Sequence, residues 1–261
     1  MVERTPSFLD VENLSKHFDG NFVLDKISFQ LKEKEIVALI GPNGSGKTTL
    51  FNILSGFLEP SQGGIIFKGA KISHLPPNRI AKMGIVRTFQ IVRLFGQISV
   101  LDNMLLATKY KEGEKLSSAL LRRNLIHEEE KKNIKKSLEL LDFVGLSEKK
   151  DALGENLSFG QRKLLELAMA FATQADLILL DEPTSGVFPE IKAKIVRIIQ
   201  KLNQEGKTII FIEHDMEFVI QLAKRVIVLD HGKLIADGSP EEVIKHERVL
   251  DAYFGKGDSH A

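Results

Sequence analysis

The chain has 261 residues, a length that suits one large domain or two small ones and can bury a sizeable core. Its 36 basic residues nearly balance its 35 acidic residues, and a formal net charge of +1 does not favour binding to bulk nucleic acid. Cysteine is absent, which excludes disulfides and thiol chemistry. No apolar stretch resembles a signal peptide or approaches the ~20 residues that cross a bilayer, so we expect a protein that is soluble by itself and reaches a membrane only through a partner.

The first part of the chain predicts strands around a glycine-rich turn. Residues 9–14, 22–31 and 63–68 have the pattern of strands, several with alternating polarity. Val37–Ile40 is a short apolar run that ends at Gly-Pro and predicts a buried strand, and Thr48–Gly56 predicts the helix that follows. A strand, a glycine-rich turn and a helix in this order are typical of the start of an α/β unit.

The middle of the chain, residues 92–159, predicts an inserted helical subdomain. Helical patterns with few β-branched residues cover Val100–Thr108, Leu116–Ile126 and Glu128–Val144. Within residues 127–136, Glu and Lys recur at i,i+4 spacing, which is typical of a solvated helix face.

The α/β pattern resumes after this insertion. Leu177–Leu180 and Thr208–Ile212 predict buried strands, and Lys192–Gln204 between them predicts a helix. Apolar strands joined by helical crossovers indicate a parallel sheet that is covered on both faces.

Together these patterns predict a single domain of the α/β class over residues 1–261. Strands at 225–230 and 233–236 fit an antiparallel patch beside the parallel core. Ser239, followed by Pro and two Glu, is a helix-start signal. The expected parts are a core of residues 8–91 and 160–238, a helical subdomain over 92–159 and one C-terminal helix over 240–254.

The clearest chemical signal is "GPNGSGKT", Gly41–Thr48, which fits the phosphate-loop pattern. Its glycines let the turn direct successive backbone N–H groups inward, and the N-terminus of the following helix favours an anion. Lys47 supplies a charge for the β- and γ-phosphates of a nucleotide, and Thr48 supplies a hydroxyl for Mg²⁺. The residues expected to bind the nucleotide here are Gly41, Pro42, Asn43, Gly44, Ser45, Gly46, Lys47, Thr48 and Thr49.

An acidic pair ends the apolar strand in "LILLDEP", Leu177–Pro183. Alone, Asp-Glu is typical of a surface turn, but a strand end places these carboxylates at the edge of the sheet where the phosphate loop lies. Asp181 is the expected Mg²⁺-side ligand. Glu182 points in a different direction along an extended chain and is the expected base that orients and deprotonates the attacking water.

Two further polar residues follow predicted strands. His214, in "FIEHD", comes just after a buried strand, and its imidazole is expected to reach a γ-phosphate oxygen or the attacking water. Gln90, in "RTFQ", stands where the helical insertion begins and is expected to contact Mg²⁺ or water.

In this order and spacing, the motifs resemble those of the ATP-binding-cassette (ABC) ATPases over almost the whole chain. They are the phosphate loop 41–48, Gln90, "LSFGQ" 157–161, "LILLDEP" 177–183 and His214. The resemblance implies a RecA-like P-loop NTPase fold and hydrolysis of Mg·ATP by Lys47, Gln90, Glu182 and His214.

The resemblance also implies a head-to-tail dimer in which each LSFGQ stretch closes over the ATP of the partner. Ser158, the N–H of Gly160 and Gln161 are the implied contacts to the partner's ATP. An aromatic residue just upstream of the second strand stacks on adenine in this family, and Phe18 matches it. Two residues depart from the family pattern: Phe159 replaces the second glycine of the signature, and Phe188 replaces an Asp that helps couple the two sites.

Longer segments resemble the ATP-binding subunits of prokaryotic importers for branched-chain (hydrophobic) amino acids, for instance "RTFQIVRLFGQISVLDNMLLA". The implied partners are a second cassette, with a heterodimer favoured, a transmembrane permease that Gln90 and 91–95 face, and indirectly a solute-binding protein. The implied location is the cytoplasmic face of the cell membrane. Cassettes for urea or lipopolysaccharide, a nucleotide-gated module with low turnover, and a soluble ABC ATPase of DNA repair or translation remain alternatives.

Overall fold

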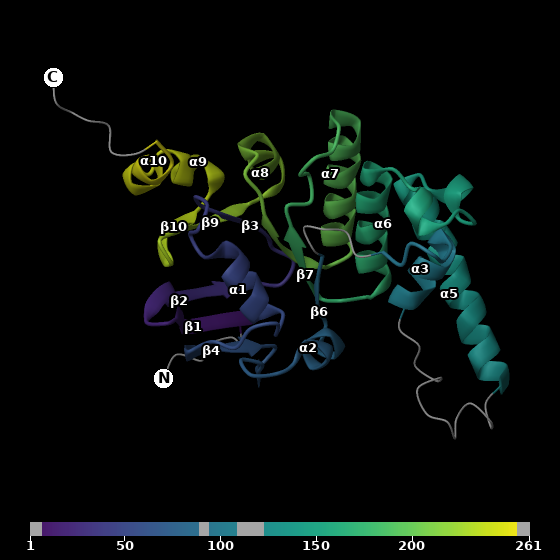
Figure 1. Ribbon diagram of the computed structural model, residues 1–261, viewed down its shortest axis with the longest axis horizontal. Helices are drawn as coiled ribbons and strands as arrows, with labels where there is room; N and C mark the ends of the chain where they lie inside the picture. The colour runs from purple at the N-terminus through teal and green to yellow at the C-terminus, as the bar shows by residue number, and fades with distance from the viewer. Residues whose placement is uncertain (1–6, 89–93, 109–122, 255–261) are drawn as a thin grey trace. The chain divides into compact units, whose positions relative to one another are not determined.

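The computed structural model describes residues 7–88, 94–108 and 123–254 (Figure 1). It divides into two compact units. The first, which we call the sheet unit, comprises 1–87, 176–183 and 200–261, and the second, the helical unit, comprises 88–175 and 184–199. The expected α/β fold, a parallel sheet with additional antiparallel strands, is confirmed. In the part of the chain that the structure describes, no helix is long and apolar enough to cross a membrane.

The sheet unit is built on a six-stranded sheet in the order β10-β9-β3-β8-β7-β6. All neighbouring strands run parallel except β10, which pairs antiparallel with β9. Every residue of β3, β7 and β8 is buried, which explains the continuous apolar runs in these three strands. The strands are β3 Ile36–Ile40, β6 Ile85–Arg87, β7 Leu177–Asp181, β8 Thr208–Ile212, β9 Arg225–Asp230 and β10 Lys233–Gly238.

An antiparallel sheet in the order β2-β1-β4-β5 completes this unit. One buried core joins apolar side chains of both sheets to those of α1, such as Leu50 and Phe51, and to Ile80 of α2. Helix α1 directly follows β3, so this core fixes the turn between them, which is the predicted phosphate loop (Figure 1). The elements are β1 Leu9–Phe18, β2 Asn21–Leu31, β4 Gln62–Phe67, β5 Ala70–Lys71, α1 Lys47–Leu54 and α2 Pro77–Met83.

The C-terminal segment differs from the prediction of one helix over 240–254. It forms two helices, α9 Pro240–Ile244 and α10 Glu247–Phe254, after α8 Met216–Leu222. In one straight helix, Val243 and Val249 would point about 120° apart around the axis. The break between the helices lets both side chains be buried, at 2% and 5% exposure. No Gly or Pro marks this break, so the sequence pattern did not reveal it.

The helical unit packs α3, α5 and α6 against one another around buried residues such as Met104, Leu141 and Leu165 (Figure 1). The predicted helices at 100–108 and 128–144 are confirmed as α3 and α5. Most of the predicted helix at 116–126 lies outside the described residues. The bounds are α3 Val100–Ala107, α5 Arg123–Val144 and α6 Phe159–Ala172, with short 3₁₀ helices at Ser147–Lys149 and Gly154–Asn156. Helix α7, Pro189–Gln204, is shared between the two units.

Candidate nucleotide-binding site

The turn from β3 to α1 has the backbone that a phosphate loop requires. Gly41, Gly44 and Gly46 have φ angles of 150°, 80° and 102°, which side chains rarely allow. A Cβ at Gly46 would also lie 2.7 Å from both Leu24 Cδ2 and Val23 O of β2, so the loop passes too close to this strand for any side chain. Among the described residues no side chain caps α1, and its N-terminus remains suited to an anion.

Lys47 lies at the start of α1 with its ammonium turned back over the loop. The side chain is 6% exposed, and Nζ donates hydrogen bonds to Gly41 O at 2.7 Å and Pro42 O at 2.8 Å. Burial lowers the pKa of Lys47, whereas the carboxylates of Glu182 and Asp181 act in the opposite direction. The structure therefore brings the lysine of the loop within electrostatic range of both predicted acidic residues.

Asp181 ends β7 as predicted, and it forms a buried ion pair that sequence reasoning missed. Its Oδ2 lies 2.7 Å from Nη2 of Arg87, and the two side chains are only 7% and 5% exposed. Arg87 Nη1 also donates to Asn52 Oδ1 of α1 at 2.6 Å, and the guanidinium lies over the Phe51 ring. The sequence held one signal for this pair: Arg87 and Asp181, which carry opposite charges, each end a predicted strand. Arg87 therefore orients Asp181.

Glu182 and His214 meet at the carboxyl ends of neighbouring strands. His214 Nε2 lies 3.3 Å from Glu182 Oε1, and both side chains are partly exposed, so water can reach them. Glu182 has a φ of 47°, an uncommon conformation for a non-glycine residue, and its N–H donates to Ile212 O at 3.0 Å. Such backbone strain clusters at functional sites, because the surrounding structure must hold it.

The site fits Mg²⁺ held together with nucleotide phosphates better than a metal cage of protein groups. Among the described residues there is no cluster of three or more His, Asp and Glu that could hold a metal ion. Mg²⁺ in nucleotide sites usually takes one or two carboxylates, phosphate oxygens and water. Asp181 supplies the buried carboxylate, and Thr48 is exposed at the first turn of α1. Gln90, the third predicted ligand, lies outside the described residues.

The LSFGQ stretch forms the N-terminus of α6 in the helical unit. Ser158 Oγ accepts from the Gln161 N–H at 3.3 Å, and the Ser158 N–H donates to Gln161 Oε1 at 2.9 Å, which is a capping box. A Cβ at Gly160 would lie 3.0 Å from Ile191, so this helix end packs closely on α7. Two of the signature residues therefore have a structural role in this state.

Three phenylalanines singled out in the sequence, Phe18, Phe159 and Phe188, lie at exposed positions. Phe18 ends β1 and is 47% exposed, with Lys16 Nζ 5.0 Å from the centre of its ring. In the helical unit, Phe159 packs beside Gly186, where an added Cβ would lie 3.2 Å from the ring. Phe188, the departure in the loop after Glu182, is 78% exposed.

Comparisons with known proteins agree with this geometry. Residues 24–185 match the model of the ABC transporter family, and residues 233–259 match that of the branched-chain amino acid ATP-binding cassette transporter. The high-affinity branched-chain amino acid transport ATP-binding protein LivG of Salmonella typhimurium is 37% identical over 249 residues, which cover 95% of this chain and 98% of LivG.

Solved structures show the same cassette. A nucleotide-free ATP-binding cassette from an ABC transporter has a TM-score of 0.81 and 32% identity, over 96% of this chain and 100% of that chain. A dimeric post-hydrolysis cassette bound to ADP and Pi has a TM-score of 0.74 and 25% identity, over 89% and 98% of the two chains. Since the family model covers more than half of the chain and LivG nearly all of it, this chain belongs to the ABC transporter family and is one of its ATP-binding, ATP-hydrolysing cassettes.

Proposed function

We propose that this chain is the ATPase subunit of an importer for branched-chain or other hydrophobic amino acids. The observation that carries the ATPase is the contact of Glu182 with His214 beside the buried Lys47. The match of residues 233–259 to the branched-chain amino acid cassettes and the identity with LivG support the solute. Both compact units then belong to one nucleotide-binding domain, with its helical subdomain inserted into the core.

In this proposal the residues of the loop bind the ATP phosphates. Lys47 leaves the carbonyls of Gly41 and Pro42 for the phosphate oxygens, and the amides of residues 43–49 add hydrogen bonds. Phe18 stacks on the adenine. Because the charge that develops on the γ-phosphate faces fixed donors, electrostatic stabilisation supplies most of the rate.

Water activation belongs to Glu182, with His214 holding the water and the γ-phosphate in place. Glu182 accepts the proton of the attacking water, and the nearby imidazole keeps its carboxylate oriented. Asp181, Thr48 and Gln90 would hold Mg²⁺, which would supply positive charge to the phosphates. Arg87 keeps the Asp181 carboxylate aimed at the site.

We further propose that two cassettes form the working unit, with a sister subunit favoured as the second. The similarity to a dimeric cassette bound to ADP and Pi supports the pairing. In the pair, Ser158, Gly160 and Gln161 of each cassette would contact the ATP of the other. The dimer binds from the cytoplasm to transmembrane permease subunits, which Gln90 and 91–95 face, and a solute-binding protein delivers the amino acid. The near-neutral charge supports no role for nucleic acid.

Co-reconstitution tests the solute. The chain, its sister cassette, the permease subunits and the solute-binding protein, reconstituted in vesicles, should take up radiolabelled leucine in an ATP-dependent manner. Unlabelled isoleucine or valine should compete. Urea in place of leucine serves as the control solute. Uptake of urea but not of leucine would overturn the amino-acid assignment and leave the ATPase intact.

Hydrolysis should depend on protein concentration more steeply than linearly. A site that is completed by the partner's signature works only in the dimer, so specific activity rises as the dimer forms. Phosphate release by the purified chain across a wide range of concentrations, with and without the sister cassette, measures this. Constant specific activity at every concentration, in a chain shown to be monomeric, would contradict the shared site.

Two substitutions at Ser158 should separate its capping role from its role in the dimer. Ser158→Ala loses the cap of α6 and should lower the free energy of unfolding by about 1 kcal/mol. Ser158→Asn keeps a capping oxygen and should leave this free energy nearly unchanged. Both variants should lose hydrolysis in a dimer, because neither supplies the hydroxyl. Full activity of Ser158→Asn would reduce Ser158 to a helix cap.

A further inference from the structure

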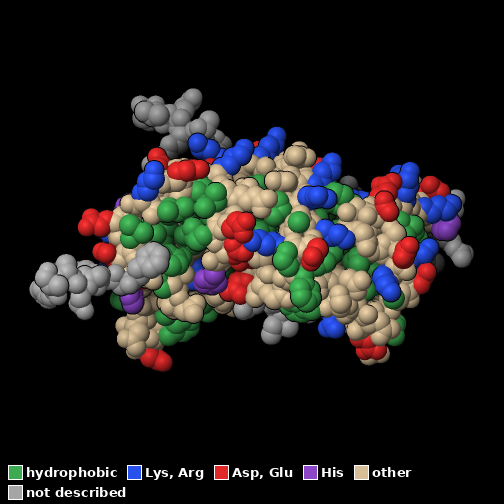
Figure 2. Space-filling view, turned by 90° about the horizontal axis from the view of Figure 1, so that it is seen from above, with side chains coloured by type: hydrophobic (Ala, Val, Ile, Leu, Met, Phe, Trp, Pro, Cys, Tyr) green, Lys and Arg blue, Asp and Glu red, His purple; other side chains and the backbone are tan. Residues whose placement is uncertain are grey.

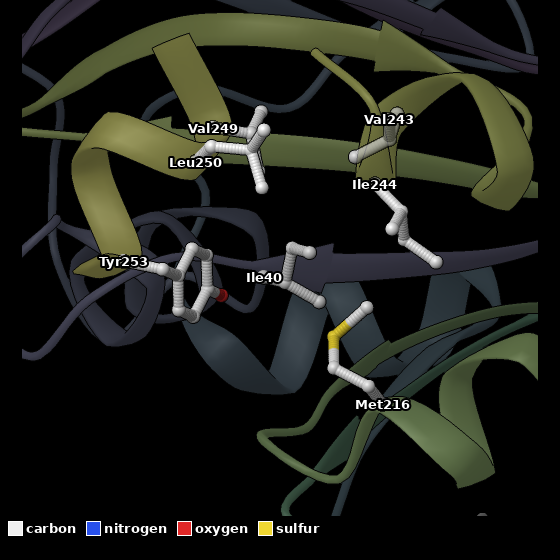
Figure 3. A pocket seen from close by; sticks show the side chains of 7 residues that line it. All are labelled: Ile40, Met216, Val243, Ile244, Val249, Leu250 and Tyr253. Carbon is white, nitrogen blue, oxygen red and sulfur yellow. The ribbon is translucent and has the colours of Figure 1, made fainter. Parts of the chain in front are cut away.

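The C-terminal helices form an apolar cavity beside the start of the phosphate loop. It has a volume of about 230 Å³, and β3, α8, α9 and α10 supply its apolar and aromatic walls (Figure 3). Leu250 and Tyr253, both on α10, are 42% and 38% exposed. Figure 2 shows apolar side chains gathered over α9 and α10, in the left part of the view. The cavity is therefore open to a side chain from another molecule.

Two residues of the nucleotide site flank this cavity. Ile40, in its β3 wall, immediately precedes Gly41 of the phosphate loop. Met216, in its α8 wall, comes two residues after His214. In the proposed function the phosphate loop and His214 both face the γ-phosphate of ATP. The cavity therefore lies beside the place where the signature of a partner would close.

An exposed phenylalanine, Phe188, stands at the start of α7 in the helical unit. At 78% it is the most exposed of the large apolar side chains in the described part of the chain. Its carbonyl oxygen accepts hydrogen bonds at 3.0 Å from the N–H groups of Ile191 and Lys192, and the following Pro189 restricts its backbone. The backbone thus presents the ring from a fixed point, so little further ordering is needed when the ring binds a partner.

Contacts with the signature lie on both sides of Phe188. Two residues before it, Gly186 packs beside the Phe159 ring, and three residues after it, Ile191 packs beside Gly160. All of these residues belong to the helical unit. Phe188 therefore stays beside the N-terminus of α6, and it comes close to a partner cassette wherever the signature does.

The cavity and the Phe188 ring match in size and chemistry. An apolar cavity of about 150 Å³ is large enough to hold benzene, so this cavity of about 230 Å³ admits a phenyl ring. Tyr253 and Met216 in its walls favour an aromatic guest, because a second ring and a thioether both make favourable contacts with a phenyl group. A second copy of this chain carries such a ring next to its signature.

We propose that in a dimer of two copies of this chain, the Phe188 ring of each copy enters the apolar cavity of the other. As the signature of one copy closes over the ATP of the other, the ring fills the space between Ile40 and Leu250. The contact forms twice, because a two-fold dimer repeats each of its interface contacts. This proposal rests on the function proposed above, since it requires the signature to meet the nucleotide of the partner.

The dimer Kd of the full chain measures this contact. Glu182→Gln with ATP and Mg²⁺ serves as the parent, and analytical ultracentrifugation gives its dimer Kd. Adding Phe188→Ala should raise this Kd at least about tenfold, the effect of burying one phenylalanine side chain. The midpoint of thermal unfolding and the affinity of the monomer for ATP should not change, because the ring is exposed in the single chain. Phe143→Ala removes a 44%-exposed ring from α5 and is the matched control, which should keep the parent Kd.

A substitution in the cavity tests the other side of the contact. Leu250→Asp places a charge where the ring would be buried, and it should also raise the dimer Kd at least about tenfold. When Leu250→Asp is combined with Phe188→Ala, the Kd should rise much less than the product of the two single effects, because both side chains belong to one contact.

Crosslinking identifies the residues that meet. The chain has no cysteine, so Phe188→Cys and Leu250→Cys each introduce a single thiol. When these two variants of the parent are mixed with ATP and Mg²⁺, a short bis-maleimide should join position 188 of one copy to position 250 of the other, as peptide mapping can show. Phe57→Cys, placed past the far end of α1, should not be joined to Phe188→Cys.

The outcomes separate this contact from the proposed function. A parent-like Kd in Phe188→Ala, or a dimer without the crosslink between positions 188 and 250, would overturn this proposal alone. A dimer that forms only after a sister cassette is added would overturn the pairing of two copies. A chain that binds ATP but forms no dimer under any of these conditions would overturn the proposed shared site as well.

Discussion

Glu182→Gln should abolish ATP hydrolysis while leaving ATP binding intact. Glutamine has the shape of glutamate, so it can keep the strained backbone at φ 47° and the hydrogen bond to Ile212 O. It cannot accept a proton from water, and loss of a general base costs about 10²- to 10⁴-fold in rate. Phosphate release should therefore fall by at least about 100-fold. Size-exclusion chromatography with ATP and Mg²⁺ should show a dimer that persists, because the closed state no longer resolves by hydrolysis.

His214→Gln is the matched comparison for this experiment. In the wild type, His214 Nε2 lies 3.3 Å from the Glu182 carboxylate. We assign His214 to orienting the water and the carboxylate rather than to proton transfer. It should lower kcat less than Glu182→Gln does, with ATP binding again retained. Rapid hydrolysis by Glu182→Gln would refute the role of Glu182 as base. Equal losses of kcat in the two variants would instead indicate that Glu182 and His214 act as one unit.

Arg87→Met should destabilise the protein more than any other substitution considered above. It leaves the Asp181 carboxylate, 7% exposed, without its 2.7 Å partner, and removing one member of a buried ion pair costs about 3–5 kcal/mol. The Asn52 amide loses the donor of its hydrogen bond at the same time. Chemical denaturation followed by circular dichroism measures the free energy of unfolding, and Mg²⁺-dependent ATP binding should weaken as Asp181 loses its orientation.

The chain offers a matched control for this prediction. Arg225 makes two hydrogen bonds to Asp237, at 2.6 and 2.7 Å, but these side chains are 23% and 27% exposed. Arg225→Met removes the same chemical group from a better solvated pair and should cost clearly less. The double variant Arg87→Met with Asp181→Asn should be less destabilised than the sum of its single changes. A cost for Arg87→Met no larger than that for Arg225→Met would contradict the assignment.

The sequence by itself determined the parts of this protein whose signals are local. The phosphate loop is eight consecutive residues between a buried strand and a helix, so one pattern specifies its backbone and its chemistry. The Asp181-Glu182 pair was placed at a strand end because a continuous apolar run ends there. The α/β class followed for the same reason, since apolar strands buried on both faces need helical crossovers.

Only the tertiary structure decided which distant side chains meet. Arg87 and Asp181 end neighbouring strands, but strand order is not written in either segment. The break between α9 and α10 accompanies the burial of both Val243 and Val249, and no Gly or Pro in the sequence marks it. Such contacts form when segments that are remote in sequence pack together. The hydrophobic periodicity of a segment indicates only which of its own faces is buried, and not which segment covers that face.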